Sequence, residues 1–138
     1  MCLSVRSKMR VFCILTISFL MLLGCSSSTP EEQAARAARA YYQHLIDDRP
    51  AEFLQGKADA DSLPDSYRAQ LLMAINQYRA DMLDKHNGLN EVRVSDNVAR
   101  RDTSLHLTYA FLLLCYGDST QEEITVPMVE RDGQWLMK

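Results

Sequence analysis

The sequence predicts an α+β domain in which N-terminal helices pack on an antiparallel sheet of four strands. Apolar residues recur at helical spacing as far as residue 86, whereas beyond Gly88 they alternate with polar residues, as in strands. Helices that precede consecutive strands, and do not alternate with them, favour an antiparallel sheet with the helices on one face. The chain of 138 residues is long enough for one such domain, which we place at 31–138.

Three helices are expected before the strands. The first follows Thr29, because Pro30 suits a first helical turn and Glu32 completes a capping box, and it extends to Ile46. A short second helix covers 51–55. A third begins with a similar capping pattern at Ser62 and ends at Asn87-Gly88. Its expected apolar face comprises Tyr67, Leu71, Leu72, Ala74, Ile75, Tyr78, Met82 and Leu83.

The strands are predicted from alternation. Val92, Val94 and Val98 mark the first strand. The second strand is the longest, and we expect its core face to be formed by Leu105, Leu107, Tyr109, Phe111, Leu113 and Cys115. The third strand has an inner face of Ile124, Val126 and Met128. Asp132-Gly133 predicts a tight turn into a last strand over 134–138.

Residues 1–24 have the pattern of a secretory signal peptide. Arg6, Lys8 and Arg10 precede an apolar run from Val11 to Leu23, and the segment contains no acidic residue. A membrane-spanning helix needs roughly 20 apolar residues. The run has only 13, so we interpret it as a signal and not as a membrane span.

The signal ends in Leu22-Leu23-Gly24-Cys25, which resembles the lipobox of bacterial lipoproteins. In that class the cysteine thiol receives a diacylglyceryl group, the chain is cut before the cysteine, and the new amine is usually acylated, for example with palmitate. The resemblance implies that Cys25 anchors the protein in a membrane of the cell envelope, with 25–30 as a short tether. Ser26 is not the aspartate that retains many such lipoproteins at the inner membrane, so we expect the outer membrane, facing the periplasm.

Charge and cysteine content exclude several function classes. The whole chain has a net charge of −3, and removal of the three basic residues of the signal leaves 12 basic and 18 acidic residues, or −6. So acidic a domain is a poor partner for nucleic acid, and its membrane attachment is expected through lipid and not through charge. Cys2 and Cys13 lie in the signal, which leaves Cys115 without a disulfide partner. His44, His86 and His106 lack the spacing of metal ligands, so we expect no metal and no other cofactor.

Three segments resemble a known family: Asn87–Val94 (NGLNEVRV), Tyr116–Thr120 (YGDST) and Glu130–Trp135 (ERDGQW). They are similar to small bacterial lipoproteins with a nuclear-transport-factor-2-like domain, many of them grouped as domains of unknown function. The resemblance covers 31–138 and implies a cone, in which a curved sheet wraps a long helix and leaves a pocket at the open end. The turn Gly-Asp-Ser departs from the commoner Gly-Asp-Gly. Members include isomerases, dehydratases, ligand-binding domains and protein-docking domains, so this fold does not determine an activity.

The leading hypothesis is therefore a lipid-anchored binding protein without catalysis. Its cone would bind a small apolar ligand or an envelope protein, with Tyr42, Tyr78, Tyr109, Phe111 and Trp135 as candidate pocket lining. The resemblance also implies a homodimer through the sheet face as one mode of association.

The alternative hypothesis is a pocket enzyme of the isomerase or hydro-lyase type. Such an enzyme needs an inward-facing acid or histidine beside a hydrogen-bond donor. Asp96 is a candidate general base because it is in register with Val94 and Val98, although a bulge also explains it. His44, next to the apolar stripe of the first helix, is the other candidate base, with a position on the rim as the competing interpretation.

Overall fold

The computed structural model describes residues 27–138, so the predicted signal and Cys25 lie outside the described residues. The elements within this range are α2 (Pro30–Ile46), α3 (Pro50–Gln55), the 3₁₀ turn η1 (Ala60–Ser62), α4 (Asp65–His86), β1 (Leu89–Asp102), β2 (Leu107–Tyr116), β3 (Gln121–Arg131) and β4 (Gln134–Met137). None of the helices between residues 27 and 138 has both the length and the apolar character needed to cross a membrane.

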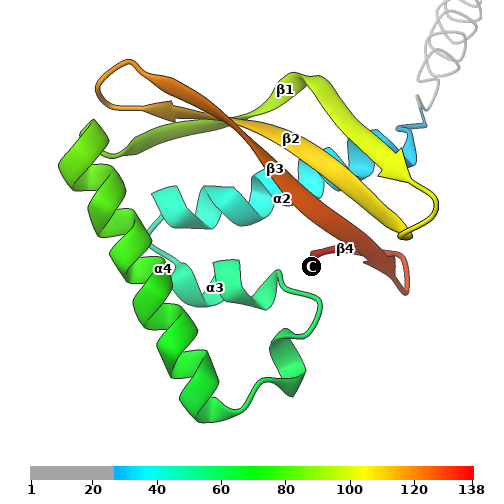
Figure 1. Ribbon diagram of the computed structural model, residues 1–138, viewed down its shortest axis with the longest axis horizontal. Coiled ribbons are helices and arrows are strands. Elements are labelled where there is room, and N and C mark those ends of the chain that lie inside the picture. Colours follow the sequence, from blue (N-terminus) through cyan, green and yellow to red (C-terminus); the bar gives the residue numbers. More distant parts are fainter. Residues whose placement is uncertain (1–26) are drawn as a thin grey trace, which may run out of the picture.

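The predicted α+β architecture is confirmed. The four strands form one antiparallel sheet in the order β1-β2-β3-β4, and the helices precede it in the chain. Figure 1 shows α2 lying across one face of the strongly twisted sheet, with α4 at one end of the molecule. We call the face against α2 the inner face and the opposite face the outer face.

The first helix forms as the sequence predicts. The backbone N–H of Glu32 donates to the Thr29 hydroxyl oxygen at 3.2 Å, and the Thr29 N–H donates to the Glu32 carboxylate at 3.0 Å. This capping box satisfies two donors that a helix start otherwise leaves free. Ala34, Ala35 and Ala38 are fully buried, because small side chains let the helix approach the sheet closely.

The inner face of β2 differs from the prediction. The residues that join the buried core are Ala110, Leu112, Leu114 and Tyr116, with Thr108 also buried, and they pair with the inner residues Val126 and Met128 of β3 as expected. Tyr109, Phe111, Leu113 and Cys115 alternate with them and are only half-buried, on the outer face. Both faces of β2 are apolar, so the alternation of residues does not determine which of the two faces is buried against α2. Leu105 lies in the β1–β2 turn and is exposed.

Helix α4 also departs from its predicted packing. Its N-cap is Pro64, which has no side chain to cap with, and Ser62 instead ends η1 and bonds to the carbonyl of Asp59. Of its 22 residues only Met82 is buried, although the sequence suggests a broad apolar face. The end of the helix is as predicted, since Asn87 adopts a left-handed conformation with φ 61° and Gly88 follows it.

The remaining turns follow the sequence. Asp132 and Gly133 both have positive φ, 52° and 77°, in the hairpin between β3 and β4. The last strand then pairs on its free side with the chain after α3, where the Ala58 N–H donates to the Met137 carbonyl at 2.7 Å. This pairing fixes α3 near the edge of the sheet.

Candidate functional site

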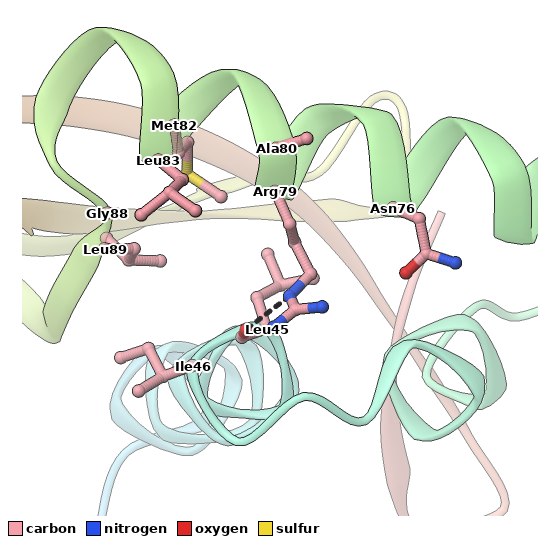
Figure 2. A pocket seen from close by; sticks show the side chains of 9 residues that line it. All are labelled: Leu45, Ile46, Asn76, Arg79, Ala80, Met82, Leu83, Gly88 and Leu89. Carbon is pink, nitrogen blue, oxygen red and sulfur yellow. Dashed lines mark hydrogen bonds between the residues drawn. The ribbon is translucent and has the colours of Figure 1, made fainter.

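A groove of about 440 Å³ lies between α4 and the C-terminal end of α2. Figure 2 shows its lining, which combines one end of α2, one face of α4 and the start of β1: Leu45, Ile46, Asn76, Arg79, Ala80, Met82, Leu83, Gly88 and Leu89. Most of these side chains are aliphatic. A concave, mostly apolar site with a few polar groups is the usual form of a binding pocket.

Arg79 ties the two walls of the groove together. Its Nε–H donates to the carbonyl oxygen of Leu45 at 2.8 Å, the bond dashed in Figure 2, and its Nη1 lies 2.5 Å from an Asp48 carboxylate oxygen. The carbonyl bond satisfies a backbone acceptor at the end of α2. Asn76 is the other polar side chain of the lining, so the groove offers an apolar surface with polar groups at one side.

The apolar surface continues along α4 beyond the groove. Met73, Asn76, Ala80 and Leu83 recur at helical spacing on one face, and Met73 is 73% and Leu83 65% exposed. Tyr67 and Tyr78 on the same helix are 48% and 41% exposed. The two tyrosines lie on the opposite side of the helix from this row by helical spacing. Large exposed apolar side chains beside an apolar groove, here Met73 and Leu83, are typical of an interaction site. We call the row Met73, Ala80 and Leu83 the α4 strip.

The C-terminal end of α4 is held against the β2–β3 turn by backbone contacts. The N–H of Gly117 donates to the Gly88 carbonyl, and the N–H of Asp118 to the His86 carbonyl, both at 2.9 Å. A Cβ at position 117 would lie 2.2 Å from the Asn87 carbonyl oxygen, so this approach requires glycine. We call these contacts the α4 clamp.

Side chains reinforce the clamp. The His86 ring stacks on Tyr116 with centroids 4.4 Å apart, and its Nδ1 lies 3.0 Å from an Asp118 carboxylate oxygen. Hydrogen bonds from the Thr120 hydroxyl and N–H, followed by the bond to His86, lower the pKa of Asp118 to about 2. An exposed carboxylate held in this way stays ionised and is a weak base.

Three tyrosines lie near this end of the domain. The Tyr116 hydroxyl donates to the Glu122 carboxylate at 2.7 Å. Burial, with that hydrogen bond next, raises the Tyr116 pKa, and burial also raises the pKa of Tyr78, with the Glu122 charge adding to it. Burial raises the pKa of Tyr42 to about 12. These hydroxyls therefore stay protonated, and that of Tyr116 serves as a hydrogen-bond donor.

In the described part of the chain, neither candidate base faces inward beside a hydrogen-bond donor, as the enzyme hypothesis requires. Asp96 lies where the β1–β2 register shifts between Val94 and Ala99, and its side chain is exposed at a hollow of about 320 Å³ that Ser95 and Glu123 also line. His44 is half-buried on α2, and its Nδ1 is buried without a hydrogen-bond partner among residues 27–138. The structure does not bring the two residues together, and neither lines the groove.

The five candidate aromatic residues are spread over the domain. Tyr42 packs edge-to-face on Phe53 with centroids 5.2 Å apart. Tyr109 and Phe111 lie on the outer face, the surface of the expected homodimer, and Arg100 is 5.8 Å from the Tyr109 ring. Trp135 lines a separate polar hollow of about 410 Å³, and its carbonyl accepts a bond of 2.7 Å from the Tyr41 hydroxyl. None of the five, Tyr78 included, lines the groove.

Sequence reasoning missed the residues that form the groove and the clamp. Arg79 and Asn76 were not singled out, and His86 was explained by its place at the end of a helix. A usable signal was present, since Leu72 and Leu83 widen the apolar face of α4 beyond one stripe. Within residues 27–138 no cluster of histidine, cysteine and acidic side chains is arranged to hold a metal.

Comparison with known proteins supports the fold. Neither a family model nor a curated protein matches the sequence. A crystal structure from Campylobacter jejuni, named "Putative NTF2-like transpeptidase", matches with a TM-score of 0.58 and 11% identity, over 80% of this chain and 97% of that one. The protein has an NTF2-like fold. At this identity the likeness extends to the fold alone, so function has to be argued from the NTF2-like domain's own surface.

Proposed function

We propose that the protein is a lipid-anchored lipoprotein of the bacterial envelope whose NTF2-like domain binds an apolar segment of another envelope protein. The observation that carries this proposal is the groove between α2 and α4, continued by the exposed α4 strip. A helix of 22 residues with one buried side chain gains little from packing within its own domain. Its apolar residues are better explained by a partner.

The form of the groove favours a protein segment over a small ligand. A pocket for a small molecule usually encloses 70–90% of its ligand, whereas Leu83 on the groove wall is 65% exposed, and the same helix face carries the exposed Met73 beyond Asn76. An amphipathic helix or extended segment places apolar side chains at regular intervals along such a surface. Methionine on the exposed surface, here Met73 of the α4 strip, adapts to varied partner side chains.

The lipid anchor rests on the sequence. The lipobox-like Leu22–Cys25 follows the apolar run directly, and the acidic domain gives no alternative electrostatic route to an anionic membrane. Each buried methylene contributes about 0.8 kcal/mol, so one acyl chain holds weakly and several hold permanently. Acylation of Cys25 is therefore sufficient for stable attachment.

Photocross-linking in the native host tests the binding site. A photoreactive amino acid at Met73 is expected to give a cross-linked product of defined mass, whereas the same group at Gln134, exposed at the start of β4, gives none. Ala80→Glu places a charge in the groove and should abolish the product. Ala74→Glu, the same change on an exposed position of α4 outside the groove, should not.

Two results would contradict the binding proposal. One is a product from Met73 that Ala80→Glu leaves unchanged. The other is a small apolar molecule that co-purifies with the native protein, is seen in its native mass spectrum and is lost in Ala80→Glu. The second result would move the function to small-ligand binding at the same groove.

Mass spectrometry and fractionation test the anchor. The mature protein should begin at Cys25 and carry a diacylglyceryl group, and Cys25→Ala should leave the membrane fraction. Cys115→Ala is the control, since Cys115 is half-buried on β2 and should not affect attachment. An unmodified Cys25 in the native host would refute the anchor.

A further inference from the structure

The start of α2 lies near the β1–β2 turn. The two elements run in opposite directions, because the last residues of α2, Leu45 and Ile46, meet the start of β1 at Leu89 in the groove, and the Arg39 Nε–H donates to the Val92 carbonyl at 2.9 Å. The beginning of α2 therefore points to the end of β1. Figure 1 shows both at the right-hand end of the long axis, with α4 at the opposite end.

The chain length before α2 limits how far this end can lie from a lipid anchor. Four residues, 26–29, separate Cys25 from Pro30 at the start of α2, and they span at most about 14 Å at roughly 3.5 Å each. If Cys25 carries the acyl chains, as proposed above, the end of the domain that holds the β1–β2 turn is within this distance of the leaflet. The groove then faces away from the membrane.

The β1–β2 turn has a fixed shape with an apolar side chain at its tip. The Asp102 carboxylate accepts bonds from the Ser104 N–H at 3.0 Å, the Ser104 hydroxyl at 2.7 Å and the Leu105 N–H at 3.1 Å. Leu105 is 57% exposed between polar neighbours. A leucine held outward on a rigid turn loses little conformational freedom when it enters an apolar phase.

The charged side chains near this turn give no reason to expect a preference for anionic over neutral lipid. Arg100, Arg101 and His106 are exposed there, but the first turn of α2 carries Glu31 and Glu32. Acidic and basic side chains of similar number offset each other. The apolar tip, and not a basic patch, is therefore the feature that a membrane would recognise.

We propose that the β1–β2 turn is a second membrane contact, in which Leu105 enters the boundary between headgroups and acyl chains of the leaflet that holds the anchor. The proposal rests on the acylated Cys25 of the proposed function. His106 directly follows Leu105, and the exposed Arg101 lies at the end of β1 just before the turn, so both side chains would lie at the depth of the headgroups. The contact orients the domain so that the α4 strip is presented to the periplasmic space.

Fluorescence quenching in vesicles tests this contact. The full acylated protein is placed in phosphatidylcholine vesicles that contain lipids brominated near the headgroup end of the acyl chain. Leu105→Trp should be quenched well beyond the wild-type signal of Trp135. Leu83→Trp, at a position of similar exposure at the opposite end, should match the wild type. Circular dichroism confirms that both variants fold.

The outcomes separate this proposal from the anchor. If the mass spectrum shows an acylated Cys25 and the protein floats with the vesicles, but Leu105→Trp is not quenched beyond wild type, the second contact is wrong and the anchor stands. Equal quenching at positions 105 and 83 also overturns it, because the domain then has no preferred orientation. An unmodified Cys25 overturns both proposals. Quenching that needs added anionic lipid refutes an apolar contact.

Discussion

The two long helices bury very different shares of their surface. In α2, which has 17 residues, Ala34, Ala35, Ala38 and Leu45 are buried, and the helix contacts all four strands. In α4, which has 22 residues, only Met82 is buried, and the helix packs mainly against α3 and β1, with Arg79 bonded to the end of α2. Helix length and apolar content therefore do not indicate which helix forms the core. Small residues mark the helix that packs closely, and large exposed ones mark the helix for which we propose a partner.

Core truncation should show the largest difference between the two regions. Leu112→Ala removes a fully buried side chain from the inner face beneath α2 and should lower the free energy of unfolding by about 2–5 kcal/mol. Leu83→Ala, on the α4 strip, should change it by less than about 0.5 kcal/mol. Urea denaturation followed by circular dichroism measures both. A large loss for Leu83→Ala would place α4 in the core and break the comparison.

Alkaline pH should lower the stability of the domain through ionisation of Tyr42, which is half-buried on α2. The pKa of Tyr42 is about 12 in the folded protein and about 10 when unfolded, so its contribution is complete below pH 10 and is lost as the pH rises toward 12. A difference of two units corresponds to about 2.7 kcal/mol as an upper limit. Tyr42→Phe should flatten this part of the stability profile. Tyr67→Phe, on exposed α4, should leave the slope unchanged.

Acid should have the smallest effect, at the α4 clamp. Because the pKa of Asp118 is lowered to about 2 from its ordinary 3.8, its contribution is present above pH 4 and is lost as the pH falls toward 2. The side chain is exposed, so solvent screening keeps the effect small. Asp118→Asn should remove this acid dependence, and Asp132→Asn in the β3–β4 turn should retain it. Thermal unfolding between pH 2 and pH 5 measures the difference.

The fold was predictable from the sequence because its signals are local. The Thr29–Glu32 capping box, the Asn87-Gly88 helix end and the Asp132-Gly133 turn each act within a few residues, and all three appear in the structure as expected. The change from helical to alternating period at Gly88 then determined the order of helices and strands. The inner residues Val126 and Met128 of β3 followed from the same alternation.

The site was less predictable because it depends on contacts between distant segments. The phase of β2 was wrong, since both its faces are apolar and only the position of α2 decides which one is buried. The apolar stripe of α4 was expected to be core, because periodicity reports an apolar face and not what covers it. The pairing of His86 with Asp118 joins residues 32 positions apart, and no local pattern encodes it.

The α4 clamp holds the C-terminal end of its helix, so a small rotation of α4 about the clamp would be magnified at the N-terminal end. The helix spans about 33 Å from Asp65 to His86 at 1.5 Å per residue. A rotation of about 5° about the clamp would carry the Asp65 end through roughly 3 Å while Leu83 hardly moves, as follows from rigid helix geometry. Such a rotation would stretch the bonds from Arg79 to Leu45 and Asp48 and the bond from Arg68 to the Ala60 carbonyl. These two arginines therefore set how far the α4 wall of the groove can open for a bulky partner.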